Sequence, residues 1–262
     1  ETSGELLDKW EIKTRTENQG EAILPDIAQA VKAKMAEKKL VKEQIIGLGM
    51  GLPAPVTEDG IVQNTANLGW GYKEVTRELE ELLDGMKVIP GNDANVAALG
   101  EMWKGGGRGY DSIVMVTLGT GVGGGVILQG KILTGCKGAG GEIGHMKVNM
   151  DETRVCGCGN KGCLEQYASA TGIVNMAKEN VPEGSYLADK KVTAKAVFDG
   201  AKEGDAYCME VVEKFGRYLG VALSNVAHVV DPEAFVIGGG VSAAGQILLD
   251  VVEKYYNENS MF

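Results

Sequence analysis

The chain has 262 residues, of which 44% are hydrophobic and 24% charged, so it can bury a core and is not a disordered polymer. Its 36 acidic and 26 basic side chains give a net charge of −10, which argues against nucleic acid or an anionic membrane as its main partner. No apolar run reaches about 18 residues, the length that a membrane-spanning helix needs.

Strands and helices alternate in the first part of the chain. Leu6, Leu7 and the residues Trp10–Thr14 predict an edge strand, and apolar residues at helical spacing predict a helix over Ala22–Lys39. The next predicted elements are a strand at Ile45–Met50, a helix at Tyr72–Leu83, a strand at Lys87–Pro90 and a helix at Ala94–Trp103. This alternation predicts an α/β fold.

A glycine-rich stretch, Lys104–Tyr110, predicts a boundary between a smaller N-terminal lobe (1–103) and a larger C-terminal lobe (104–262). The elements predicted after it are strands at Ser112–Leu118 and Gly125–Leu128, helices at Leu164–Glu179, Thr193–Lys202 and Asp205–Val229, a strand at Phe235–Ile237 and a helix at Ala243–Tyr256.

The run Gly119-Thr120-Gly121-Val122-Gly123-Gly124 matches the dinucleotide fingerprint GxGxxG. That fingerprint requires a helix to follow, whereas here the β-branched run Gly125–Leu128 follows, so we predict a hairpin turn instead. A turn of Gly and Thr exposes backbone N–H groups and one hydroxyl, which can hold phosphate oxygens. We therefore favour phosphate binding over a plain tight turn.

Asn92 and Asp93 follow a predicted strand and precede a predicted helix. One interpretation is structural, because Asp is a favoured N-cap residue. The other is a carboxylate kept ionised by the helix N-terminus, able to take a proton from an alcohol during phosphoryl transfer. The residues alone leave both open.

Cys156, Cys158 and Cys163 lie within a glycine-rich loop that His145 precedes. Three thiols and one imidazole are a standard tetrahedral zinc set, which we favour over a buried thiol cluster or a disulfide. The chain has five cysteines, an odd number, which favours a reducing, cytoplasmic compartment.

Glu142, His145 and Glu165 are interleaved with these cysteines, and carboxylates accept hydrogen bonds from vicinal hydroxyls such as those of sugars. Gly238, Gly239 and Gly240 follow a predicted strand and could accept an adenosine or its phosphate, or simply allow close packing. The sequence thus predicts a structural zinc loop beside a sugar site.

Two segments now carry a resemblance to a known family. Gly141–His145 and Cys156–Glu165 resemble the two signatures of the ROK family of bacterial sugar kinases and repressors, most closely its glucokinase branch. Val116–Val126 is similar to the second phosphate motif of that family, Pro90–Glu101 to its catalytic segment and Val236–Gly245 to its adenosine loop. The resemblance covers essentially the whole chain.

The resemblance implies a two-lobed, actin-like (ribonuclease H-like) ATPase fold with a central cleft that closes on a hexose and ATP with Mg²⁺. It implies that Asp93 is the base for the sugar 6-hydroxyl, that Ala54, Asn92, Glu142, His145 and Glu165 bind the sugar, and that His145, Cys156, Cys158 and Cys163 hold zinc. It also implies a homodimer.

ROK kinases begin with an Asp-x-Gly-Gly-Thr hairpin, and Glu1–Thr14 resembles only its second half. Because the last helix of the family is also unmatched after Phe262, we expect the natural protein to be longer. Glucose is the expected substrate, since Gly141 precedes Glu142 as in the glucokinase branch. An acetamido sugar such as N-acetylmannosamine or N-acetylglucosamine, and a sugar-sensing repressor, are the alternatives.

Overall fold

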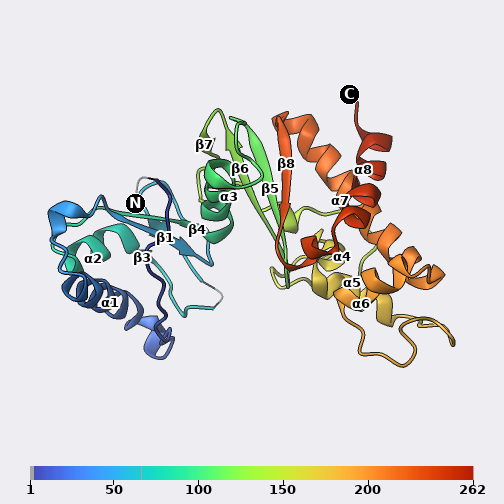
Figure 1. Ribbon diagram of the computed structural model, residues 1–262, viewed down its shortest axis with the longest axis horizontal. Helices are drawn as coiled ribbons and strands as arrows, with labels where there is room; N and C mark the ends of the chain where they lie inside the picture. Colours follow the sequence, from blue (N-terminus) through green and yellow to red (C-terminus); the bar gives the residue numbers. More distant parts are fainter. Residues whose placement is uncertain (1–2, 66, 262) are drawn as a thin grey trace.

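The computed structural model describes residues 3–65 and 67–261 and places two bodies of helix and sheet side by side (Figure 1). The elements of the first body are α1 (Ile23–Glu37), β1 (Leu48–Leu52), β2 (Ile61–Val62), β3 (Lys73–Glu74), α2 (Val75–Leu82) and β4 (Val88–Asn92). Strands β1 and β4 pair in parallel, with Leu52 opposite Asn92. This pairing brings the loop that follows β1 next to the residues that follow β4.

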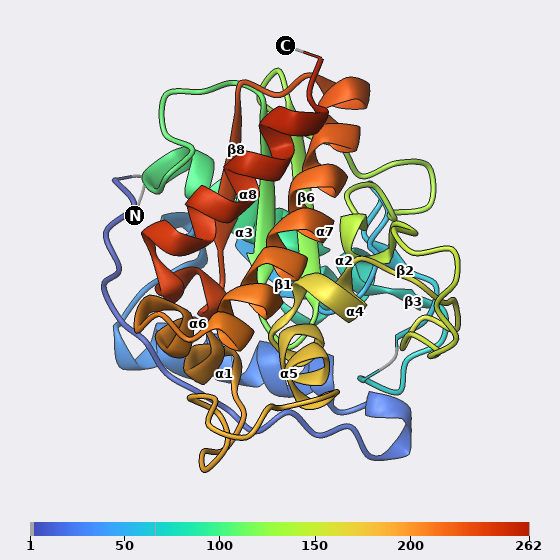
Figure 2. The ribbon, with the colours of Figure 1, turned by 90° about the vertical axis from the view of Figure 1, so that its right-hand side faces the viewer.

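The second body is built on a sheet with the strand order β7-β6-β5-β8. The remaining elements are α3 (Asp93–Lys104), β5 (Ile113–Leu118), β6 (Val122–Leu128), β7 (Lys131–Ile132), α4 (Glu165–Ala168), α5 (Ala170–Lys178), α6 (Ala194–Lys202), α7 (Ala206–Val230), β8 (Ala234–Gly238) and α8 (Gln246–Asn259). Strand β5 pairs antiparallel with β6 and parallel with β8. Helix α3 lies on one face of the sheet, and α7 and α8 cross the other (Figures 1 and 2).

Strand β5 is buried on both faces because alternate residues point to opposite sides of a sheet. Val114 and Val116 are fully buried among the helices of the α7–α8 side, whereas Ile113 and Met115 belong to a cluster with Ala98 of α3. A continuous apolar run is the pattern expected for a strand covered on both faces. It identified this strand correctly from the sequence.

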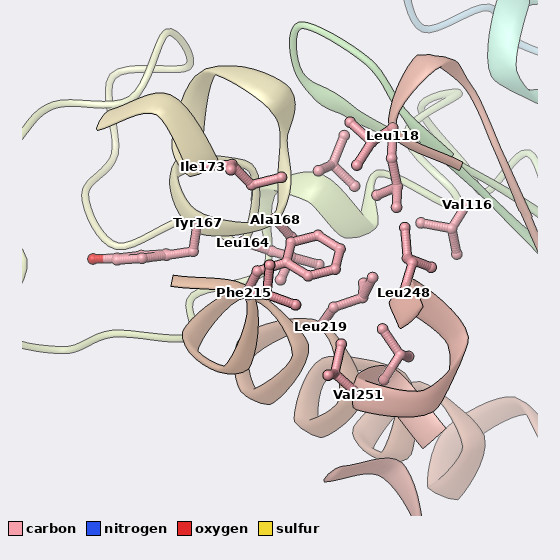
Figure 3. Close-up of a cluster of buried hydrophobic side chains, with 14 of the residues drawn as sticks. Val116, Leu118, Leu164, Tyr167, Ala168, Ile173, Phe215, Leu219, Leu248 and Val251 are labelled. Atoms are coloured by element: carbon pink, nitrogen blue, oxygen red, sulfur yellow. The ribbon is translucent and has the colours of Figure 1, made fainter. Parts of the chain in front are cut away.

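The larger core lies between this sheet and the helices α4–α8 (Figure 3). Phe215 of α7 is fully buried there. Its ring packs edge to face on the ring of Phe198, with the ring centroids 5.7 Å apart. Leu164 and Ile173, on the segment that follows the cysteine loop, are buried in the same cluster. Each such side chain contributes about 1.5–3 kcal/mol through burial, so the core fixes the position of the loop it carries.

Helix α3 lies between the two bodies. Its Ala98 packs so closely on β6 that a Cβ at Gly125 would lie 2.6 Å from the Ala98 Cβ. The smaller body has a separate buried cluster, to which α1 contributes Ile23, Leu24 and Ala28. The boundary predicted after residue 103 remains a prediction.

The edge strand predicted at Leu6–Leu7 and Trp10–Thr14 is wrong. Among the described residues of this segment, no strand forms, and Leu6 and Trp10 are exposed. A strand requires a partner for its N–H and C=O groups, and this segment has none in the described chain. Glu1 and Thr2 lie outside the described residues.

The single helix predicted over Leu164–Glu179 is also wrong, because it is two helices, α4 and α5. Ser169 between them is extended, with φ −91° and ψ 167°, and its hydroxyl accepts a hydrogen bond from the N–H of Gly172. Ser is favoured at such an N-cap, so it ends one helix and starts the next. None of the described helices has both the length and the apolar character needed to cross a membrane.

Candidate functional site

The first part of the site is the N-terminus of α3. Asn92 is its N-cap, and its Oδ1 accepts hydrogen bonds from the N–H groups of Ala94 (3.0 Å) and Asn95 (3.2 Å). The capping role that the sequence left open for Asp93 is therefore filled by Asn92. The Asp93 carboxylate is exposed at the first position of the helix, where its Oδ1 also accepts from Ala94 N at 2.8 Å.

The side chain of Asn92 also reaches the loop after β1. Its Nδ2 donates to the carbonyl of Ala54 over 3.4 Å, and Ala54 itself is buried. The parallel pairing of β1 with β4 makes this contact possible, because both chains leave the sheet at the same edge. Ala54, Asn92 and Asp93 are thus brought together as the sequence predicted.

The second part is the turn between β5 and β6. Leu118 pairs with Val122, and Gly119 N donates to the carbonyl of Gly121 at 3.0 Å, so the segment Gly119–Gly121 forms a tight hairpin turn. This confirms the hairpin and excludes the strand–turn–helix of a dinucleotide fingerprint. A Cβ at Gly123 would lie 2.5 Å from Thr117 Oγ1 and 3.2 Å from the Ala94 Cβ, so glycine allows the turn to approach α3.

The turn, α3 and β8 meet around one pocket of about 470 Å³. Its lining residues are Asp93, Ala94, Ala97, Thr117, Gly119, Gly121, Val122, Gly123, Glu165 and Gly239. Of the predicted site residues, this pocket joins Asp93 and Glu165 with glycines of both predicted nucleotide segments. Thr117 was not predicted as a site residue, although its place on β5, two residues before the turn, was a signal that could have found it.

Gly239 brings the end of β8 to the pocket. It has φ +86°, and a Cβ there would lie 2.6 Å from the carbonyl oxygen of Leu118, so a side chain would displace the β5–β6 turn. Gly238 ends β8 and Gly240 begins a short 3₁₀-helix (Gly240–Ala244), and neither lines the pocket. Thr120, on the turn, is exposed.

The third part is the cysteine loop. One ligand atom each from His145, Cys156, Cys158 and Cys163 lies within 4.8 Å of the others. The Sγ atoms of Cys158 and Cys163 are 3.7 Å apart, and the Sγ of Cys156 lies 3.8 Å from His145 Nδ1. All five cysteines are free thiols. The predicted ligand set therefore converges and could hold a metal ion.

Glu165 links this cluster to the pocket. Its Oε1 accepts a hydrogen bond from the Cys156 thiol at 2.8 Å and lies 3.7 Å from His145 Nδ1. The other ring nitrogen of His145 faces Glu142, with Nε2 and Oε2 4.0 Å apart. Burial raises the pKa of the Cys156 thiol, so without a metal the sulfur keeps its proton. The S–H group then donates a hydrogen bond to Glu165.

A second group of polar side chains holds the loop and was not predicted. Gln166 accepts from the N–H groups of Gly162 (2.8 Å) and Cys163 (3.1 Å) and donates to the carbonyl of Arg154. Its side chain thereby joins both ends of the cysteine loop. The position of Gln166 beside Glu165 was the one signal in the sequence that could have pointed to it. Its hydrogen-bond partners could be identified only from the fold.

Glu152 lies beneath the same loop and is nearly buried. Its Oε2 accepts from Arg154 Nη2 at 2.6 Å and from the Tyr167 hydroxyl at 2.5 Å. The hydrogen bond from Arg154 lowers the pKa of Glu152 to about 2, while burial and Glu152 raise the pKa of Tyr167 to about 12. The ionised carboxylate is therefore the form that the folded loop stabilises.

Glu152→Gln is expected to flatten the acid end of the stability profile. The folded pKa of Glu152 lies below its ordinary value of 4.5, so its stabilisation is fully present above pH 4.5 and is lost as the pH falls towards 2. Unfolding by urea, measured at steps of pH between those limits, should depend less on pH in the variant. The exposed Glu183→Gln is the matched control, and an identical slope in Glu152→Gln and the wild type would contradict the assignment.

Comparison with known proteins identifies the family of this chain. The family model of the ROK family matches residues 1–261. A glucokinase of Halalkalibacterium halodurans is 44% identical over 263 residues, covering 97% of this chain and 79% of that protein. A glucokinase of Thermotoga maritima is 38% identical over 254 residues, covering 94% of this chain and 78% of that protein.

The solved structure of a ROK family glucokinase from Streptomyces griseus, in complex with glucose and AMPPNP, matches with a TM-score of 0.76. The identity is 31%, and the match covers 100% of this chain and 85% of that one. The chain belongs to the ROK family, and its fold is the two-lobed, actin-like ATPase fold of that family. The resemblance to the glucokinase branch is confirmed as well.

Proposed function

We propose that this protein transfers the terminal phosphoryl group of ATP to the 6-hydroxyl of glucose. The observation that carries the proposal is the pocket in which the Asp93 carboxylate and the Gly119–Gly121 turn face the same space. Phosphoryl transfer needs a group that orients and deprotonates the acceptor and donors that hold the phosphates, close together. The relatives named glucokinase support the choice of hexose.

In this proposal Asp93 is the base that takes the proton of the acceptor hydroxyl. Its carboxylate is exposed and lines the pocket at the N-terminus of α3. Asn92 is anchored to the start of α3 and to the carbonyl of Ala54, so the loop after β1 and the start of α3 present one edge to the sugar. The backbone at Ala54 and the amide of Asn92 would bind sugar hydroxyls.

Glu142, His145 and Glu165 would bind the other hydroxyls. The three side chains form a chain of contacts, since His145 lies between the two carboxylates. Carboxylates accept strong hydrogen bonds from neighbouring hydroxyls, which is the chemistry that distinguishes a sugar from a simple alcohol.

We assign the nucleotide to the glycine segments. The turn residues Gly119, Thr120 and Gly121, with Gly123, would surround the phosphate oxygens. The Thr120 hydroxyl and the backbone N–H groups other than that of Gly119, which donates to Gly121, would hold them. Gly238, Gly239 and Gly240 would accept the adenosine, and Gly239 lines the pocket. ATP would supply the phosphoryl group together with Mg²⁺, which neutralises phosphate charge.

The ligand cluster fits zinc. Two sulfurs bound to one tetrahedral zinc at about 2.3 Å lie about 3.8 Å apart. The separation of Cys158 Sγ and Cys163 Sγ, 3.7 Å, agrees with this. Zinc held by His145, Cys156, Cys158 and Cys163 would fix the loop that leads into α4 and its first residue Glu165, and it would leave His145 Nε2 free to face a ligand.

We further propose that the lobes 1–103 and 104–262 close over the bound sugar, which would exclude water from the pocket. A cytoplasmic homodimer completes the proposal.

The test is an assay of ADP release by the whole gene product with glucose, fructose, N-acetylglucosamine and N-acetylmannosamine. Glucose should give the highest kcat/KM. Turnover with an acetamido sugar alone would replace glucose as the substrate. Sugar binding without any ADP release would favour the repressor alternative.

A further inference from the structure

The turn Gly119–Gly121, to which we assign the phosphates, is held from outside by the segment Glu165–Thr171. The carbonyl of Gly119 accepts a hydrogen bond from Ala170 N at 2.8 Å. The next carbonyl, that of Thr120, accepts from Thr171 Oγ1 at 2.8 Å. A Cβ at the third residue, Gly121, would lie 2.7 Å from Glu165 Oε2. Each residue of the turn therefore meets a different residue of this segment.

The segment itself is rigid. Ser169 is almost fully buried, its hydroxyl donates to the carbonyl of Glu165 at 2.6 Å, and it accepts from Gly172 N at 2.9 Å. One turn further on, Ile173 is fully buried in the large core. Thr171 thus projects from a helix whose own position is fixed by packing.

The turn has little to hold it otherwise. Its glycines carry no side chains, and the one backbone hydrogen bond within it joins Gly119 N to Gly121 O. Glycine backbones explore many conformations, so N–H groups on such a turn bind phosphate well only if something else fixes them. The two hydrogen bonds from α5 do this by occupying the carbonyls of Gly119 and Thr120, so the N–H groups of the turn other than that of Gly119 still face a ligand.

We propose that Thr171 is a positioning residue for the nucleotide, because its hydroxyl holds the Thr120 carbonyl of the turn. The N–H of Ala170 has the same role at the Gly119 carbonyl. The proposal rests on the function proposed above, because it assumes that the turn binds phosphate. It assigns to α5 the orientation of the phosphate-binding turn, a role separate from binding the hexose.

The experiment compares three variants of the whole gene product. Thr171→Val removes the hydroxyl and keeps the shape, while Thr171→Ser keeps the hydroxyl. Ala170→Pro removes the second donor at the first position of α5, where proline is favoured, and the extended Ser169 that precedes it suits a proline. Thr171 is exposed, so Thr171→Val should fold normally. Circular dichroism and zinc content verify that all three are folded.

The readout is the affinity for AMPPNP and for glucose by calorimetry, with the KM of each substrate. Thr171→Val should weaken AMPPNP binding and raise the KM for ATP by about two- to twelve-fold, the value of one hydrogen bond, with glucose affinity unchanged. Ala170→Pro should act in the same direction, and Thr171→Ser should match the wild type.

The proposal is overturned if AMPPNP affinity is unchanged in Thr171→Val and Ala170→Pro, if Thr171→Ser is as weak as Thr171→Val, or if glucose affinity falls in parallel. Because binding is measured apart from turnover, the function can fail separately. A wild type that binds AMPPNP but phosphorylates no hexose would contradict the kinase proposal and leave the role of Thr171 intact. A wild type that binds no AMPPNP would overturn both.

Discussion

Asp93→Asn is expected to lower kcat for hexose phosphorylation by about 10²–10⁴-fold, the usual contribution of a general base. The variant keeps the size of the side chain and an oxygen that can accept from Ala94 N, as Asp93 does at 2.8 Å. It removes the negative charge and the ability to take a proton. Glucose affinity, measured by calorimetry, should stay close to that of the wild type.

This substitution tests the role of the Asp93 carboxylate in the reaction, because it should leave folding unchanged. Asp93 is exposed, and the N-cap of α3 is Asn92, so the helix keeps its cap in the variant. A matched control is Asp111→Asn, which removes an exposed carboxylate that does not line the pocket. If Asp93→Asn turned over at a near-normal rate, or if it lost sugar affinity and kcat together, Asp93 would not be the base.

The sequence predicted those parts of the site that use residue types rare in this chain or that carry a clear local pattern. The chain has only five cysteines and two histidines, and three of the cysteines lie close together in one loop after a histidine. This spacing predicted the cluster that Cys156, Cys158 and Cys163 form with His145. The hairpin was predictable because Val126 and Ile127 after the glycines are β-branched and favour a strand.

The parts that could not be predicted depend on partners distant in sequence. Trp10–Thr14 has the composition of a strand, but a strand also needs a neighbour to pair with, and composition does not show one. The break at Ser169 arises because a hydroxyl can end one helix and cap the next, and a helical run of apolar residues hides it. Gln166 and Thr171 are ordinary polar residues until the fold sets their hydrogen bonds.

The two interpretations of Asp93 show the same limit at one residue. Asn92 and Asp93 are both good caps, so their order in the sequence left the role of the carboxylate open. The structure separates them because the Asn92 oxygen accepts from two backbone N–H groups, which leaves the Asp93 carboxylate facing the pocket. Only the backbone conformation at the end of β4 could decide which of the two residues caps the helix, and the role of Asp93 as a base remains a proposal.

Cys158→Ser is expected to lower zinc affinity by at least about 100-fold, since even residues that only orient metal ligands are worth about 10–100-fold. Cys158 is exposed, so the exchange of sulfur for oxygen leaves the core packing unchanged and acts through the ligand set. Elemental analysis of the purified variant should find little zinc. Cys136→Ser, at an exposed cysteine outside the cluster, should keep the wild-type content.

The same variant should weaken glucose binding by about 10-fold or more, the value of one lost hydrogen bond to a charged group. The reason is the path from the cluster to the pocket. Cys156 contacts Glu165 at 2.8 Å, and Glu165 lies beside His145, so a loop that is no longer fixed by metal moves the His145 ring and removes the contact that orients the Glu165 carboxylate. Metal-free protein that bound glucose as tightly as the zinc form would show that the cluster and the sugar site are independent, and that the fold alone holds Glu165 in place.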